Sequence, residues 1–368
     1  MMDLQPTEEH LAVAELTRAI GLDVLAPAAR TAEEERAVPD DVWRTLVDTG
    51  LTMPLSEELG GGGIPDTVTQ MIAIENLAYG DPGLTMAALW GGAPALLLSR
   101  HGSPEQTAGL ARLSEDPKAR GAVALYEGYG RGPEDFTTTI STAPDGTVRV
   151  KGRKVAVAFA ETADPLIVVG RDADTGALRA SLVPVSAAGV SVRGTTPGLA
   201  LDAAALATVS FDVTLAAAAA IDGEELAGTV HRLRLALAAA QVGTATRAVE
   251  YASAYATERV AFGKPIAGFQ GVSFPLAEAL MRIYEVRAEV FEAAVLVDAE
   301  RYTEAAPAVT RAVNYASEVA AEATRTAVQT LGGHGFIDEH PVEQWYRSAA
   351  ALSAIDFDPL RSAFTPAL

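Results

Sequence analysis

The sequence predicts an α+β protein of three parts, and three changes in its pattern predict it. Apolar residues recur at helical spacing over residues 1–118, short β-branched segments replace that pattern over residues 119–218, and long alanine-rich helical patterns fill residues 219–368. The chain has 368 residues, of which 49% are hydrophobic, so it can bury a large core. Helices and strands that are segregated along a chain favour separate helical and β domains over an alternating α/β fold.

The N-terminal part is predicted to be a helical domain. Apolar positions such as Leu11, Leu16 and Ile20 are spaced as on one face of a helix. Breaks at Pro39, at the glycine run 60–63 and at Asp81-Pro82-Gly83 divide the segment. We therefore expect about five helices before residue 118.

The middle part is predicted to be an all-β domain. About seven short segments alternate apolar and polar residues, and Asp145-Gly146 is typical of a hairpin turn between two of them. With no helical stretch between them, the strands favour a small barrel or sandwich over a parallel sheet. The predicted strands are 137–142, 148–151, 155–159, 166–170, 179–184, 190–193 and 207–213.

The C-terminal part is predicted to be a four-helix bundle. Its helical patterns each exceed twenty residues, and their interior positions are often alanine, which lets helix axes approach closely. Residues 357–368 contain two prolines and little periodicity. We interpret this end as a strap or a frayed tail.

Charge and composition exclude several classes of function. A net charge of −20 and a pI near 4.6 argue against nucleic-acid binding, because phosphates would be repelled by most of the surface. The absence of cysteine excludes disulfides and thiolate metal sites, and the five histidines lack metal-ligand spacing. No apolar run is long enough for a membrane span, and the start has no leader pattern. We expect a cytoplasmic protein without a metal.

Two segments of the bundle are too distinctive for generic helical sequence. The first reads ERVAFGKPI from Glu258 to Ile266 and continues through Phe269-Gln270, and the second reads VQTLGGHGF from Val328 to Phe336. Together they resemble the acyl-CoA dehydrogenase family, whose bundle carries ERxxFGxPIxxFQ and VQxxGGxG. The resemblance extends over nearly the whole chain. It implies FAD as cofactor, an acyl-CoA substrate, a homo- or hetero-tetramer and an electron-transfer acceptor.

The resemblance also implies residues that bind FAD across a subunit boundary. An arginine can bind a diphosphate through two hydrogen bonds, and glycines allow the backbone to approach it closely. In the family, the matching residues contact the pyrophosphate and adenosine of the neighbouring subunit's FAD. On this chain they are Arg259, Phe262, Gln270, Gln329, Gly332 and Gly333.

Arg234 lies on the first bundle helix, where the family has an arginine near the substrate pocket. The resemblance implies a substrate-binding role for it. A lone arginine in an alanine-rich helix is equally typical of a surface residue, so the sequence leaves both interpretations open.

The β-domain departs from the family where the flavin ring would bind. The family's TEPxAGSD cradle corresponds to residues 126–135, which begin Tyr126-Glu127-Gly128, and only Glu127 clearly survives. In the family's KxWITNG strand, Ala156 replaces the indole and Ala158 replaces the hydroxyl beside the flavin. These losses remove a hydrogen bond and a stacking face. We expect the chain's own isoalloxazine binding to be weak.

The catalytic base is also altered. The reaction needs a carboxylate to remove the α-proton of the thioester. Counting nine residues from Arg347, where most of the family has a glutamate, gives Asp356. Leu233 occupies the alternative position that some members use. Asp356 is therefore either a base, as in a nitroalkane-oxidising relative, or an exposed residue of a degenerate tail.

These patterns support three hypotheses. In the first, the chain is a subunit of an FAD-dependent acyl-CoA dehydrogenase that lends residues to a partner's site, as in heteromeric α2β2 enzymes of actinobacterial sterol catabolism. In the second, it is a self-sufficient homotetrameric flavoenzyme that uses Asp356 on an acyl-CoA or nitroalkane-like substrate. In the third, the fold serves as a flavin-free binding or scaffold module.

Overall fold

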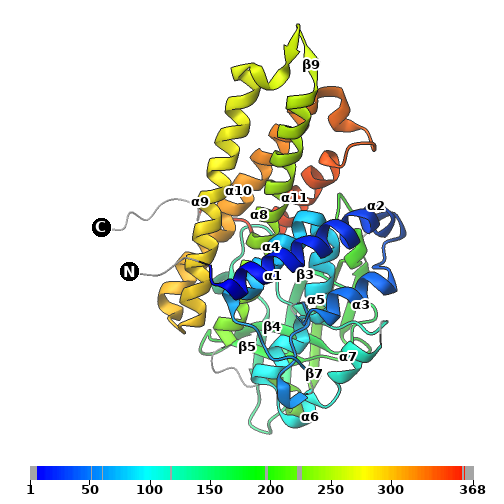
Figure 1. Ribbon diagram of the computed structural model, residues 1–368. Coiled ribbons are helices and arrows are strands. Elements are labelled where there is room, and N and C mark those ends of the chain that lie inside the picture. The colour runs from blue at the N-terminus through cyan, green and yellow to red at the C-terminus, as the bar shows by residue number, and fades with distance from the viewer. Residues whose placement is uncertain are drawn as a thin grey trace.

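The N-terminal part of the chain is a set of helices that covers one side of the molecule (Figure 1). In this computed structural model the described residues are 6–50, 52–59, 61–116, 118–194, 198–221, 226–358 and 360. Thr7 caps the first helix, and Asp66 and Asp81 cap the two long ones through their side-chain oxygens. The α-helices are α1 Glu8–Ile20, α2 Ala26–Glu35, α3 Asp40–Asp48, α4 Thr67–Gly80, α5 Pro82–His101, α6 Pro104–Thr107 and α7 Ala111–Glu115, with a π-helical turn at Gly21–Leu25.

The middle part is one hydrogen-bonded sheet of eight strands among the described residues. Its path runs β6-β7-β3-β2-β4-β5-β8, and β1 pairs with β4 off this path. Most pairs are antiparallel, whereas β1 and β2 both lie parallel to β4. The strands are β1 Ala122–Ala124, β2 Thr139–Thr142, β3 Val148–Val157, β4 Leu166–Asp172, β5 Leu178–Leu182, β6 Val190–Gly194, β7 Ala207–Leu215 and β8 Ala220–Ile221.

The C-terminal part is a bundle of four helices that rises beyond the rest of the molecule (Figure 1). Its helices are α8 Leu226–Glu258, α9 Gln270–Asp298, α10 Tyr302–Leu331 and α11 Val342–Asp356. A small hairpin of β9 Val260–Ala261 and β10 Lys264–Pro265 joins α8 to α9 at the free end of the bundle.

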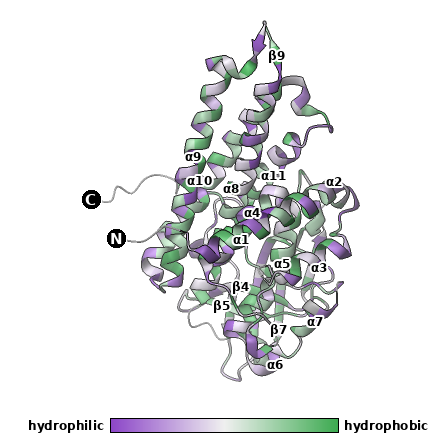
Figure 2. Cartoon of the chain, viewed as in Figure 1, coloured by the Kyte–Doolittle hydropathy of each residue, from purple (hydrophilic) through white to green (hydrophobic). Residues whose placement is uncertain are grey.

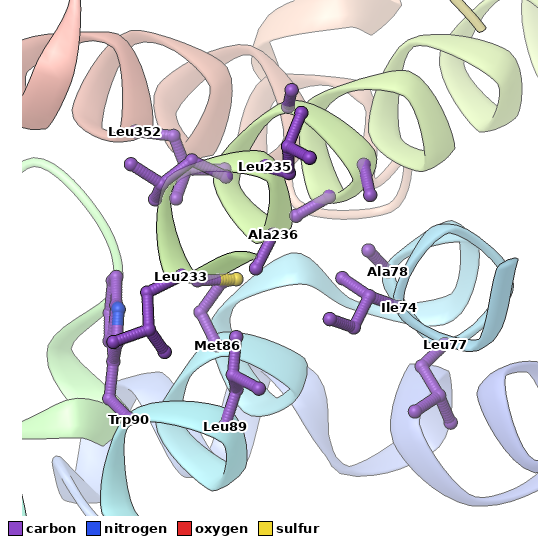
Figure 3. Close-up of a cluster of buried hydrophobic side chains, with 14 of the residues drawn as sticks. Ile74, Leu77, Ala78, Met86, Leu89, Trp90, Leu233, Leu235, Ala236 and Leu352 are labelled. Carbon is purple, nitrogen blue, oxygen red and sulfur yellow. The ribbon is translucent and has the colours of Figure 1, made fainter. Parts of the chain in front are cut away.

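The main hydrophobic core lies where α4 and α5 meet α8. In this core Leu233 and Trp90 lie close together beside Met86 and Leu89, and Leu352 of α11 covers the far side of α8 (Figure 3). A second core fills the β-domain and contains Val150, Val168 and Val209 among its members. The first half of α8 is therefore buried, which places its polar side chains inside the molecule.

The predicted fold class and domain order are confirmed, with corrections in the sheet. The predicted strands 148–151 and 155–159 form one strand, β3, whose register shifts between Lys154 and Val157. β1 and β8 are not predicted from the sequence, because segments of two or three residues carry no periodic signal. The Asp145-Gly146 turn forms as predicted, with Gly146 at a φ of 84°. No helix among the described residues is long and apolar enough to cross a membrane.

Candidate functional site

Three of the predicted FAD-binding residues lie in or beside the hairpin at the free end of the bundle. We call this end, residues 259–270 and 329–336, the bundle tip. Arg259 directly follows α8, Phe262 lies in the hairpin turn, and Gln270 begins α9. Both Phe262 and Gly263 have positive φ, 53° and 83°, and the side chain of Phe262 is 96% exposed. An aromatic residue rarely adopts this backbone conformation. The ring of Phe262 meets the ring of Phe269 edge to face, with centroids 6.2 Å apart, and hydrophobic and hydrophilic residues lie together in this hairpin (Figure 2).

The other three predicted residues form the end of α10. Gln329 lies in its last turn, and Gly332 follows the helix with φ 59° and ψ −129°, a conformation that favours glycine. A Cβ atom added at Gly332 or Gly333 would meet no atom within 4 Å. The backbone of this glycine turn is therefore open to a ligand or another chain.

One hydrogen bond brings the two segments of the bundle tip together. The Tyr255 hydroxyl lies 2.8 Å from Nδ1 of His334, the residue after Gly333, and the Tyr255 carbonyl accepts from the Arg259 backbone N–H at 2.8 Å. Arg259 is exposed and forms no ion pair with any residue that the structure describes. An open guanidinium beside an open glycine turn fits a diphosphate.

The predicted substrate and base residues, Arg234 and Asp356, contact each other instead of solvent. Arg234 Nε lies 2.7 Å from Asp356 Oδ2, and Arg234 Nη2 lies 3.3 Å from Asp356 Oδ1. Both side chains are buried, with residue exposures of 4% and 5%. The interpretations of Arg234 as a surface residue and of Asp356 as an exposed tail residue are therefore wrong, because the pair lies inside the bundle.

The ion pair limits what Asp356 can do chemically. Burial raises the pKa of the Asp356 carboxyl, and the Arg234 guanidinium opposes that rise. Both carboxyl oxygens accept hydrogen bonds from Arg234. A general base needs an oxygen within reach of the proton that it removes. Asp356 is held here in a bidentate pair that occupies both of its carboxyl oxygens.

Tyr126 connects the β-domain to this pair. It follows β1 and occupies the first position of the segment that corresponds to the family's flavin cradle. Its hydroxyl donates to the carbonyl of Leu233 on α8 at 3.2 Å, and its side chain is buried. Burial, and next the Asp356 carboxylate, raise the pKa of the Tyr126 phenol. The family's threonine is replaced by a ring that seals the β-domain against the bundle.

The last described residues complete this seal. The Gly130 N–H donates to the Phe357 carbonyl at 3.0 Å, and the rings of Tyr129 and Phe357 meet edge to face. The Asp358 N–H donates to Asn314 Oδ1 on α10 at 2.9 Å. We call Tyr126, Tyr129, Gly130, Arg234 and residues 356–358 the junction. The predicted strap exists over residues 357–358, and residue 359 and residues 361–368 lie outside the described residues.

Glu127, the residue of the cradle segment that matches the family, is fixed by contacts within the β-domain. Its carboxylate accepts from the N–H groups of Thr137 and Thr138 at 2.7 and 2.9 Å and lies 3.0 Å from Lys154 Nζ. Burial opposes ionisation, but Lys154 and the two N–H donors outweigh it and lower the pKa of Glu127 to about 2. Burial also lowers the pKa of Lys154 to about 8. Glu127 therefore holds the β-domain together, whatever binds beside it.

The replaced positions of β3 show no substitute for the lost flavin contacts. Ala156 lies in the irregular part of β3 with a φ of 51°, and Ala158 is buried. Neither side chain has a hydrogen-bonding group. Ala156 and Ala158 therefore offer neither a side-chain hydrogen bond nor an indole face to a flavin ring.

Sequence reasoning missed two features of these regions. The first is the seal made by Tyr126, although a tyrosine in place of threonine in the flavin cradle could have signalled it. The second is the hydrogen bond of His334 with Tyr255, for which the GGHG motif, 332–335, was the only signal.

Comparisons with known proteins show which family this chain is similar to. The N-terminal domain of acyl-CoA dehydrogenases matches residues 7–112, and their C-terminal domain matches residues 225–356. A probable acyl-CoA dehydrogenase of Bacillus subtilis, YngJ, is 29% identical and aligns over 95% of each chain. The structure of butyryl-CoA dehydrogenase from Megasphaera elsdenii superposes with a TM-score of 0.80 at 26% identity, over 98% of this chain and 97% of that one. The FAD complex of PigA shares the fold, with a TM-score of 0.82 at 21% identity over 98% of this chain and 97% of that one.

Proposed function

We propose that this chain, which belongs to the acyl-CoA dehydrogenase family of oxidoreductases acting on the CH–CH bond of acyl-CoA thioesters, completes the FAD site of a partner subunit. One observation carries the proposal. The residues that would serve a neighbour's FAD lie exposed at the bundle tip and form no ion pair with the described residues, whereas those that would serve the chain's own flavin are sealed at the junction.

FAD is the family's cofactor, and when bound it supplies the hydride acceptor for α,β-desaturation of the thioester. The residues of this chain would contribute to binding the cofactor. The Arg259 guanidinium pairs with the diphosphate, and the open backbone at Gly332 and Gly333 lets that group approach closely. Gln270 adds an exposed amide at the start of α9, and Gln329 adds one in the last turn of α10.

At the junction the chain's residues exclude a flavin ring. Arg234 neutralises Asp356, and Tyr126 fills the approach from the β-domain. A partner with an intact base and flavin cradle would supply the catalytic cleft. The heteromeric α2β2 arrangement, and a role in sterol or fatty-acid catabolism, are parts of this proposal.

The chain's visible spectrum tests the proposal. Purified alone, the chain should carry much less than one flavin per chain. Co-expressed with a dehydrogenase subunit that it binds, it should form a complex with one flavin for every two chains. A yellow homotetramer with stoichiometric FAD that acyl-CoA bleaches would overturn the proposal in favour of a self-sufficient enzyme.

Asp356→Asn separates the two enzymatic hypotheses. In the proposed complex this variant keeps desaturation unchanged per flavin once the folded fraction is measured. Loss of turnover with retained FAD would identify Asp356 as the base. A complex without any flavin would instead favour the scaffold hypothesis.

A further inference from the structure

The glycine turn at the end of α10 contains one residue with a side chain. Residues 332–335 read Gly-Gly-His-Gly, and Phe336 after them is 76% exposed. Glycine has the largest backbone freedom of any residue. A turn of this composition binds a phosphate group well only if something else fixes it.

The side chain of His334 is fixed by contacts on both sides. Its Nδ1 lies 2.8 Å from the hydroxyl of Tyr255 on α8. Its ring stacks on that of His340, with centroids 5.5 Å apart and planes 15° apart. These contacts come from α8 and from the segment that leads into α11, so they join the turn to two helices.

His340 is anchored in turn to the bundle interior. Its Nδ1 lies 2.8 Å from the Tyr251 hydroxyl, and the Tyr251 ring meets the ring of Trp345 edge to face at 5.5 Å. Trp345 is buried. The row Trp345, Tyr251, His340, His334 and Tyr255 therefore runs from the core of the bundle to the exposed turn.

We propose that His334 is a positioning residue for the dinucleotide, held by Tyr255 and His340 so that the Gly332-Gly333 backbone faces the partner's FAD in one conformation. The proposal rests on the proposed function of the bundle tip. Loss of the contact between His334 and Tyr255 should lower the stability of the fold little, because His334 is exposed. The contact instead orders the glycine turn before the cofactor binds.

The test is FAD affinity of the purified complex after removal and readdition of the cofactor. Tyr255→Phe and His334→Phe each remove the hydrogen bond while keeping a ring, and each should weaken FAD binding about fivefold, the size of one hydrogen bond. The double variant should be no weaker than either single one. His334→Asn, whose amide oxygen can accept from Tyr255, should restore most of the affinity.

Tyr315→Phe is the matched control, because it removes a similar hydroxyl bond, to Glu285 at 2.6 Å between α9 and α10, outside the bundle tip. FAD affinity should not change in this variant. The inference is overturned if His334→Phe binds FAD like the wild type, or if His334→Asn is as weak as His334→Phe. If Arg259→Glu also leaves FAD affinity unchanged, the proposed function fails as well, which separates the two failures.

Discussion

The bundle tip and the junction differ in how far their charged residues are exposed and paired. At the bundle tip, Arg259 is exposed, as is the glycine turn at Gly332 and Gly333. Arg259 forms no ion pair with any described residue. At the junction, Arg234 is buried and both of its contacts with Asp356 are internal. A buried charge is costly unless it is paired, whereas an exposed cation is solvated and needs no partner within the chain. The difference separates an exposed cation, which serves a partner under the proposed function, from a closed ion pair.

Removing Arg234 should give the largest effect and would sharpen this comparison. Arg234→Ala leaves the buried Asp356 carboxylate without its partner and should lower the free energy of unfolding by about 3–5 kcal/mol. Chemical denaturation measures it. The double variant Arg234→Met with Asp356→Leu should be close to the wild type, because it removes both charges. A loss below about 1 kcal/mol for the single variant would contradict the closed junction.

The pH dependence of stability tests the same region. Burial, and next the Arg234 charge, lower the pKa of His231 to about 4, and its Nδ1 has no partner among the described residues. The unfolded state, with a pKa near 6.5, binds the proton first, so stability falls as the pH drops from about 6.5 to about 4, by up to about 3 kcal/mol.

His231→Gln should reduce the change of the denaturation midpoint with pH over that range. An identical pH slope in wild type and His231→Gln would show that folding does not lower the pKa of His231.

Reversing the charge at the bundle tip tests the other side of the comparison. Arg259→Glu should weaken FAD binding by the complex about thirtyfold, since it replaces a charge-assisted contact with repulsion. The thermal stability of the isolated chain should stay the same, because Arg259 is exposed and makes no ion pair within the part of the chain that the structure describes. Arg311→Glu, exposed on α10 near its start, makes the same charge change as a control. Unchanged flavin content in Arg259→Glu would remove the basis for a role in trans.

The smallest expected effect concerns the seal. Tyr126→Phe removes the hydrogen bond to the Leu233 carbonyl and should cost about 1 kcal/mol of unfolding free energy. Tyr129→Phe, at an exposed ring three residues later, should cost nothing measurable. Equal stability of both variants would indicate that Tyr126 reaches solvent or another partner.

The sequence by itself determined the order of domains, the family and the residues of the bundle tip. These features are local, because helical spacing and motifs such as ERVAFGKPI are read over a few consecutive residues. Only the tertiary structure decided the junction. Arg234 and Asp356 are separated by 122 positions, and Leu233 and Tyr126 by 107. Whether a charged side chain faces solvent or a distant partner depends on how domains pack, and no local pattern contains that information.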